Sequence, residues 1–130
     1  MKSKLRVGMV LDDAFPPDPR VENEIVCLQQ ACYEVFLLVL GRKTDVNHDV
    51  PTGLIVDYVE FPRWVRNKAS ALAYTLPIYH RLLCPHIAHF IEERKIQTLH
   101  VHDLRVARSA FQANKKYQLP LILDLHENRP

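Results

Sequence analysis

Five short apolar runs, each ending abruptly in polar residues or a turn, recur along the chain. They predict β-strands at Leu5–Leu11, Val35–Leu40, Leu54–Phe61, Thr98–His102 and Leu121–Leu125. Continuous aliphatic runs of this length are typical of parallel strands that are buried on both faces. The pattern therefore favours a sheet in the interior of the molecule, covered on two sides.

Segments with helical spacing lie between most of these runs. Asp18 suits the N-cap of the first helix, and Pro19 suits its first turn, where a missing N–H does no harm. The apolar face of this helix is expected to comprise Val21, Ile25, Leu28 and Cys32. Such a face predicts an amphipathic helix packed on the sheet.

A longer helical pattern covers Arg63–Lys95 but contains two internal prolines. Pro77 and Pro85 each lack an N–H and clash with the preceding turn, so breaks or kinks are expected at both. After the fourth strand, Asp103 is expected to cap another helix. The buried face of that helix is expected to comprise Val106, Ala110, Phe111 and Tyr117.

The alternation of strand and helix patterns predicts one α/β domain over residues 1–130. Such an alternation implies a parallel sheet with helices on both faces. Right-handed crossovers between the strands lead to a Rossmann-like open sheet in the order 3-2-1-4-5. The polar stretch between the second and third strands, residues 42–53, is expected to be a loop.

Acidic and histidine side chains follow three of the strands directly. Asp12 and Asp13 follow the first strand, Asp103 follows the fourth, and His126 and Glu127 follow the fifth. Ligands of open α/β sheets bind just beyond the carboxyl ends of the strands. The sequence therefore predicts a ligand-handling α/β enzyme with these residues at its site.

Composition narrows the class of protein further. The 130 residues carry a net charge of +2, with 48% hydrophobic and 25% charged residues, which is ordinary for a globular domain and too weakly basic to favour nucleic acid. The three cysteines form no disulfide framework, and no apolar run approaches the roughly 20 residues of a membrane span. No signal-peptide pattern precedes the first strand, so a cytoplasmic protein is expected.

Three motifs occur in a fixed order: Asp18-Pro-Arg-Val-Glu-Asn-Glu24, His100-Val-His-Asp103 and Pro120-Leu-Ile-Leu-Asp-Leu-His-Glu127. The first resembles the Asp-x-Arg-Val-x-x-Glu that opens the first helix of many family-four glycosyltransferases, which have the GT-B fold. The others resemble the His-x-His-Asp and Pro-x-x-x-Asp-x-His-Glu at the fourth and fifth strands of that family. One departure is Ala31-Cys-Tyr33, where the family usually has a glycine in the turn before the second strand.

The resemblance implies a protein of two Rossmann-like domains with its active site in the cleft between them. The C-terminal domain would bind most of a nucleotide-sugar donor. This chain would be the acceptor-side half of a retaining, metal-independent enzyme that needs no cofactor. His126 would contact the transferred sugar, because an imidazole can donate or accept a hydrogen bond at neutral pH. A sugar or lipid-linked acceptor would be bound by Asp103, Glu127, Asp12, Asp13, Asp18 and Arg20.

The C-terminal end of the chain suggests a fragment. The last predicted strand ends five residues before Pro130, which is an unusual place for a domain to finish. The donor-binding half is expected to be missing, since the chain has three glycines and no G-x-G-x-x-G phosphate loop. Such a fragment would transfer no sugar alone, and its uncovered apolar surface would favour self-association.

Two other classes of protein share some of these features. A signalling receiver domain would use Asp12 and Asp13 for magnesium and Asp57 as phospho-acceptor. The fourth and fifth strands, however, end without the Ser or Thr and the Lys that a receiver requires. A sugar-nucleotide epimerase of the GT-B fold fits the three motifs less well than a transferase does.

Histidine pairs leave a metal site open as a further alternative. His100 and His102 alternate along one strand, so they lie on the same face and could bind a metal together with Asp103. No cysteine or third histidine lies at ligand spacing nearby. His86 and His89 form a second pair, on a helix, and are expected to face solvent.

Two charged segments each have a functional and a simpler structural interpretation. Pro62–Lys68 combines Trp64 with three basic residues, which would suit contact with the inner face of a membrane but is more simply a basic helix start. Arg20 and Glu24, at i and i+4, are more simply a surface ion pair that contributes about 0.3–0.5 kcal/mol.

Overall fold

The computed structural model confirms an α/β architecture. It describes residues 4–11, 15, 18–41, 50–59, 77–102 and 104–124, without the side chains of 77–80 and 104–105. In chain order the elements are β1 Arg6–Leu11, α1 Pro19–Gln30, β2 Glu34–Val39, β3 Ile55–Tyr58, α3 Pro77–Arg94, β4 Thr98–His102, α4 Leu104–Asn114 and β5 Leu121–Asp124.

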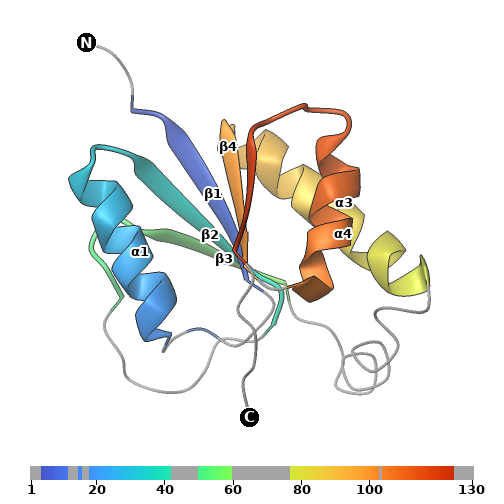
Figure 1. Cartoon of the computed structure of the whole chain (residues 1–130), viewed down its shortest axis with the longest axis horizontal. Coiled ribbons are helices and arrows are strands. Elements are labelled where there is room, and N and C mark those ends of the chain that lie inside the picture. Colours follow the sequence, from blue (N-terminus) through green and yellow to red (C-terminus); the bar gives the residue numbers. More distant parts are fainter. Residues whose placement is uncertain are drawn as a thin grey trace.

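The five described strands form one parallel sheet in the predicted order, β3-β2-β1-β4-β5. Helix α1 covers one face of this sheet, and α3 and α4 cover the other (Figure 1). β1 lies between β2 and β4, so the winding direction of the chain reverses there. Such a switch point is where open α/β sheets usually bind their ligands.

Two apolar clusters fill the space on either side of the sheet. The cluster beneath α1 includes Met9, Phe15, Val21, Ile25 and Leu37. The cluster beneath α3 and α4 includes Val10, Leu38, Ile87, Leu99 and Val101. Neighbouring residues of β1 and β2 thus enter opposite clusters, which is why both strands are continuous apolar runs in the sequence.

The N-terminal end of α1 is capped as the sequence predicts. The Asp18 side chain accepts a hydrogen bond from the Val21 N–H at 3.3 Å, and Pro19 is the first helical residue. In return, the Asp18 N–H donates to the Glu22 carboxylate at 3.0 Å. These contacts satisfy backbone donors that the first turn leaves without partners.

The C-terminal end of α1 is closed by a left-handed residue. Cys32 has a φ of 71°. Its N–H donates to the Gln29 carbonyl at 3.0 Å, and the Tyr33 N–H donates to the Leu28 carbonyl at 3.0 Å. This is the Schellman arrangement, which usually places a glycine at the left-handed position. The departure from the family pattern therefore falls on the residue whose backbone conformation favours glycine.

Two expected elements differ in extent from the structure. The third strand was expected over Leu54–Phe61; β3 covers Ile55–Tyr58, and residues 60 and 61 lie outside the described part of the chain. Breaks or kinks were expected at Pro77 and Pro85; α3 begins at Pro77, and Pro85 lies inside it without ending it. Pro85 lies on the exposed side of α3, where water can replace the hydrogen bond that the ring removes.

Two expected core residues are on the surface instead. Cys32 lies beyond the end of α1 and is exposed. Phe111 is 59% exposed, because Val106, Ala110 and Ala113, at helical spacing, form the face of α4 that packs on the sheet. Within the described part of the chain, no helix is long and apolar enough to cross a bilayer.

Candidate functional site

Four ionisable side chains from three separate elements meet at the carboxyl-terminal part of the sheet. They are Glu24 of α1, His100 and His102 of β4, and Asp124 of β5. One nitrogen or oxygen atom of each lies within 4.8 Å of the corresponding atoms of the other three. We call these four residues the polar cluster. It borders the switch point between β1 and β4.

The alternation of β4 places both histidines in this cluster. Leu99 and Val101 are buried beneath α3 and α4, so His100 and His102 point to the opposite face of the sheet, as predicted. Their rings stack with 4.5 Å between the centroids. The His102 side chain is only 1% exposed, whereas that of His100 is 14% exposed. The cluster is therefore buried on the His102 side and accessible on the His100 side.

The register between β4 and β5 positions Asp124. The Cα of Asp124 pairs with that of His102 across the parallel ladder. Its Oδ2 lies 3.8 Å from His102 Nδ1 and 3.8 Å from His100 Nε2. These three side chains are thus held by strand backbone, which positions groups more exactly than loops do.

Glu24 reaches the cluster from the second turn of α1. Val21 and Ile25 turn the apolar side of the helix toward the sheet, and Glu24 lies between them in sequence on the flank that faces β4. Its Oε2 lies 3.4 Å from His102 Nε2 and 3.9 Å from His100 Nε2. This oxygen is buried and accepts no hydrogen bond from the residues that the structure describes.

Burial is the main cause of a large pKa shift at Glu24. Loss of hydration, a hydrogen bond with Asp124 and the negative charges of Asp124 and Asp18 raise the pKa of Glu24 from its ordinary 4.5 to about 7. The positive charge of Arg20 acts in the opposite direction. A carboxyl group with this pKa can gain or lose a proton near neutral pH, as general acids and bases do.

The polar cluster has the composition of two kinds of functional site. Two imidazoles and two carboxyl groups can exchange protons with one another and with a bound substrate. The same groups are also the nitrogen and oxygen ligands that divalent transition metals bind in proteins.

Only two of the residues predicted for the site lie in the described part of the chain. Asp18 caps α1, and its charge also contributes to the raised pKa of Glu24. Arg20 is exposed in the first turn of the same helix. The residues outside the described part of the chain, whose roles stay predictions, are Asp12, Asp13, Asp103, His126 and Glu127.

The sequence pattern did not assign Glu24 or Asp124 to the site. Glu24 is more than one half of a surface pair: the charge of Arg20 still acts on it, but its side chain is only 33% exposed and lies against the two histidines. A signal was present, since Glu24 ends the first motif and Asp124 lies within the third. Only the packing of α1 beside β4 shows that the side chains of Glu24 and Asp124 meet.

Residues of the two sequence alternatives lie elsewhere. Asp57, which would be the phospho-acceptor if the chain were a receiver domain, lies within β3. It accepts two hydrogen bonds from Arg94, at 2.8 and 2.9 Å. This ion pair joins the end of α3 to β3. His86 and His89 are exposed, as predicted, and His89 Nε2 lies 2.6 Å from a carboxylate oxygen of Glu93.

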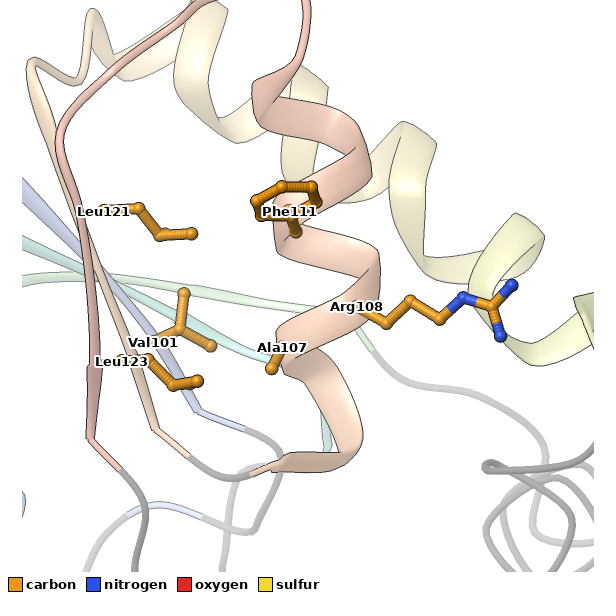
Figure 2. A pocket seen from close by; sticks show the side chains of 6 residues that line it. All are labelled: Val101, Ala107, Arg108, Phe111, Leu121 and Leu123. Atoms are coloured by element: carbon orange, nitrogen blue, oxygen red, sulfur yellow. The ribbon is translucent and has the colours of Figure 1, made fainter.

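An open hollow of about 250 Å³ lies on the other face of the sheet, between α4 and β5 (Figure 2). Leu121, Leu123 and Phe111 contribute apolar side chains to its lining, and the guanidinium group of Arg108 points away from it. Since the remaining lining residues are also apolar, this hollow offers little to acid–base or metal chemistry.

Fold and site together define a Rossmann-like α/β domain with ionisable groups at its switch point. Similar solved structures include two of the C-terminal domain of PF1911 hydrogenase from Pyrococcus furiosus. Residues 78–226 of that protein are 14% identical with a TM-score of 0.62, covering 96% of this chain and 94% of that chain. Residues 83–215 are 12% identical with a TM-score of 0.62, covering 95% of each chain.

A third similar structure is UGT2 of Phytolacca americana, complexed with UDP-2fluoro-glucose and pterostilbene. It is 11% identical with a TM-score of 0.60, and the match covers 98% of this chain but 32% of that one. Likeness at these identities shows the fold alone, which is GT-B-like in the third case. No protein-family model and no curated protein matches this sequence.

Proposed function

We propose that this chain is the N-terminal, acceptor-side half of a retaining glycosyltransferase of the GT-B type. The donor would be a nucleotide sugar bound mainly by a second domain. The acceptor would be a sugar or a lipid-linked sugar bound near the carboxyl ends of β1, β4 and β5.

The convergence of the three motifs carries this proposal. Glu24 belongs to the first motif, His100 and His102 to the second, and Asp124 to the third, yet their side chains meet in one cluster. Motifs that converge at a switch point are more specific than motifs that match one by one. The GT-B-like fold of the glycosyltransferase neighbour supports the same class of protein.

Each part of the site has a separate role in the proposed reaction. The polar cluster would hold α1 and the two strand ends in place, and His126, two residues after Asp124, would contact the transferred sugar. Asp103 and Glu127 would bind the acceptor. The rate would come from holding donor and acceptor in line and from dipoles that stabilise the leaving phosphate.

The proposed location is the cytoplasm, at the inner face of the membrane when the acceptor is lipid-linked. The basic segment Pro62–Lys68 and its Trp64 would then supply the contact with anionic lipid.

The test uses the two-domain parent protein, with labelled nucleotide sugars and a panel of lipid and sugar acceptors. His126→Ala should lower kcat by about 100-fold or more, the typical contribution of a positioned acid or base, with little change in Tm. Asp103→Ala should lower both kcat and Tm, because Asp103 is also expected to cap α4. His89→Ala, on the exposed side of α3, is the matched control and should change neither.

Three outcomes would count against the proposal in different ways. Unchanged turnover in His126→Ala would contradict the role of His126. Conversion of the nucleotide sugar without any acceptor would favour an epimerase. Micromolar binding of a nucleotide sugar by this 130-residue chain alone, measured by calorimetry, would contradict the division into donor and acceptor halves.

A further inference from the structure

We propose that Glu24, His100, His102 and Asp124 bind one divalent cation of the zinc type. The inference is independent of the proposed glycosyltransfer, because it depends only on the geometry of the polar cluster. In the described part of the chain, this is the only group of three or more His, Cys, Asp or Glu residues with ligand atoms this close together.

The imidazole–carboxylate distances within the cluster suit a shared cation better than direct hydrogen bonds between these groups. The four imidazole–carboxylate contacts are 3.4 to 3.9 Å long. Hydrogen bonds from nitrogen to oxygen are shorter, about 2.7–3.2 Å. Bonds of about 2.0–2.1 Å from zinc to its ligands put neighbouring ligand atoms of a tetrahedron roughly 3.3–3.4 Å apart. The shortest contact, between Glu24 Oε2 and His102 Nε2, is 3.4 Å, and one ligand atom of each residue lies within 4.8 Å of the other three. Side-chain shifts would therefore bring all four groups onto one ion.

The electrostatic environment also favours a cation. Glu24 and Asp124 place two carboxyl groups side by side in a partly buried site, where two negative charges repel strongly. The buried Glu24 Oε2, which accepts no hydrogen bond from the described residues, faces both imidazoles. A dication would neutralise the two carboxylates and bind this oxygen.

The donor set selects the kind of metal. Two imidazole nitrogens with two carboxylate oxygens suit zinc and its neighbours in the first transition series, whereas magnesium and calcium prefer oxygen ligands alone. Four protein ligands complete a tetrahedral shell, as in structural zinc sites. The ion would thus join α1 to the ends of β4 and β5.

Zinc binding is tested on this chain after dialysis against a chelator. Competition with a chromophoric chelator should give one zinc ion per chain. Zinc, but not magnesium, should raise the Tm. Co²⁺ bound in place of zinc should show the intense visible absorption of tetrahedral coordination. Asp124→Asn should weaken zinc binding by about 100-fold or more, since even the loss of a group that only orients a ligand costs 10- to 100-fold.

The ligand deletions are made at Asp124 and His100, which are less buried than His102, so the test stays valid if a variant at His102 fails to fold. His102→Ala removes a fully buried side chain, so His100→Ala, at 14% exposure, provides the second ligand deletion. His89→Ala is the control, because His89 and Glu93 form an exposed pair that could also attract zinc. Absence of one-to-one binding, or binding that survives Asp124→Asn and His100→Ala but not His89→Ala, would overturn the proposal.

Discussion

Cys32 is held at a φ of 71° in the turn between α1 and β2. A left-handed conformation costs a residue with a β-carbon about 1–2 kcal/mol, which glycine avoids. Cys32→Gly should therefore raise the free energy of unfolding by about 0.5–1 kcal/mol, because the relieved strain exceeds the extra entropy of glycine in the unfolded chain. Urea denaturation measures the change.

The neighbouring residue provides the control for this substitution. Ala31 has an ordinary φ of −84°, so Ala31→Gly adds entropy to the unfolded chain without relieving strain. It should lower the free energy of unfolding by about 0.5–1 kcal/mol. Changes of the same sign in the two variants would contradict the strain at Cys32.

Tyr117 and Glu92 form a pair whose stabilising effect depends on pH. The Tyr117 hydroxyl donates a hydrogen bond of 2.6 Å to Glu92 Oε1. This bond, with help from the charge of Lys116, lowers the pKa of Glu92, and it raises the pKa of Tyr117 to about 12. Because Glu92 binds its proton less tightly in the native state, the pair stabilises the fold above the ordinary glutamate value of 4.5, and this effect is lost as the pH falls through the native pKa.

Tyr117→Phe should therefore be less stable than the wild type at neutral pH. The difference should shrink when the pH falls well below 4.5, where Glu92 is protonated in both states. An NMR titration of the Glu92 carboxyl group should show its pKa moved up toward the ordinary value in the variant. A Glu92 pKa that does not move would contradict the role of the hydroxyl.

At the scale of elements, the contact between β1 and α3 depends on the absence of a side chain at Gly8. A β-carbon there would lie 2.8 Å from Ile96 Cγ2 and 2.8 Å from Phe90 Cε2, well inside the roughly 3.5 Å at which carbon atoms pack. The strand is central in the sheet, so it cannot move away without disturbing β2 and β4.

Gly8→Ala should lower the free energy of unfolding by about 1–3 kcal/mol, the usual cost of forcing an extra carbon into a packed core. Ile96→Ala removes one of the two obstructing side chains. In a double-mutant cycle the two substitutions should be less destabilising together than the sum of their separate effects. Additive effects would show that Gly8 does not govern the distance between α3 and the sheet.

At the scale of the whole molecule, apolar side chains gather at the β5 edge of the sheet. Phe111 of α4 is 59% exposed, and Ile122 and Leu123 of β5 are 54% and 43% exposed. β5 is an edge strand of the described sheet, with backbone groups on one side that pair with no other described strand. Exposed edges that are also apolar tend to pair with another chain.

The chain is therefore expected to self-associate in a concentration-dependent manner, which light scattering and sedimentation can follow. Ile122→Lys should shift the equilibrium toward monomer, because it places a charge on the edge strand. Val26→Lys on α1, where the side chain is 37% exposed, is the control and should have little effect. A wild-type chain that stays monomeric at high concentration would contradict this prediction.

The sequence by itself determined the elements and their topology. Continuous apolar runs identified β1 and β2, Asp18 and Pro19 marked the start of α1, and alternation with helices led to the order 3-2-1-4-5. These features were readable because strand and helix periodicities, and the capping preferences of single residues, are local properties of the chain.

Only the tertiary structure decided which side chains share a site and which lie on the surface. Glu24 and Asp124 join His100 and His102 because α1 crosses beside β4 and because β4 pairs with β5 in one particular register. Phe111 is exposed because α4 packs on β4 and α3 through a different face, that of Val106, Ala110 and Ala113. Contacts of this kind join residues that are far apart in the chain, so no local pattern specifies them, and packing geometry alone brings them together.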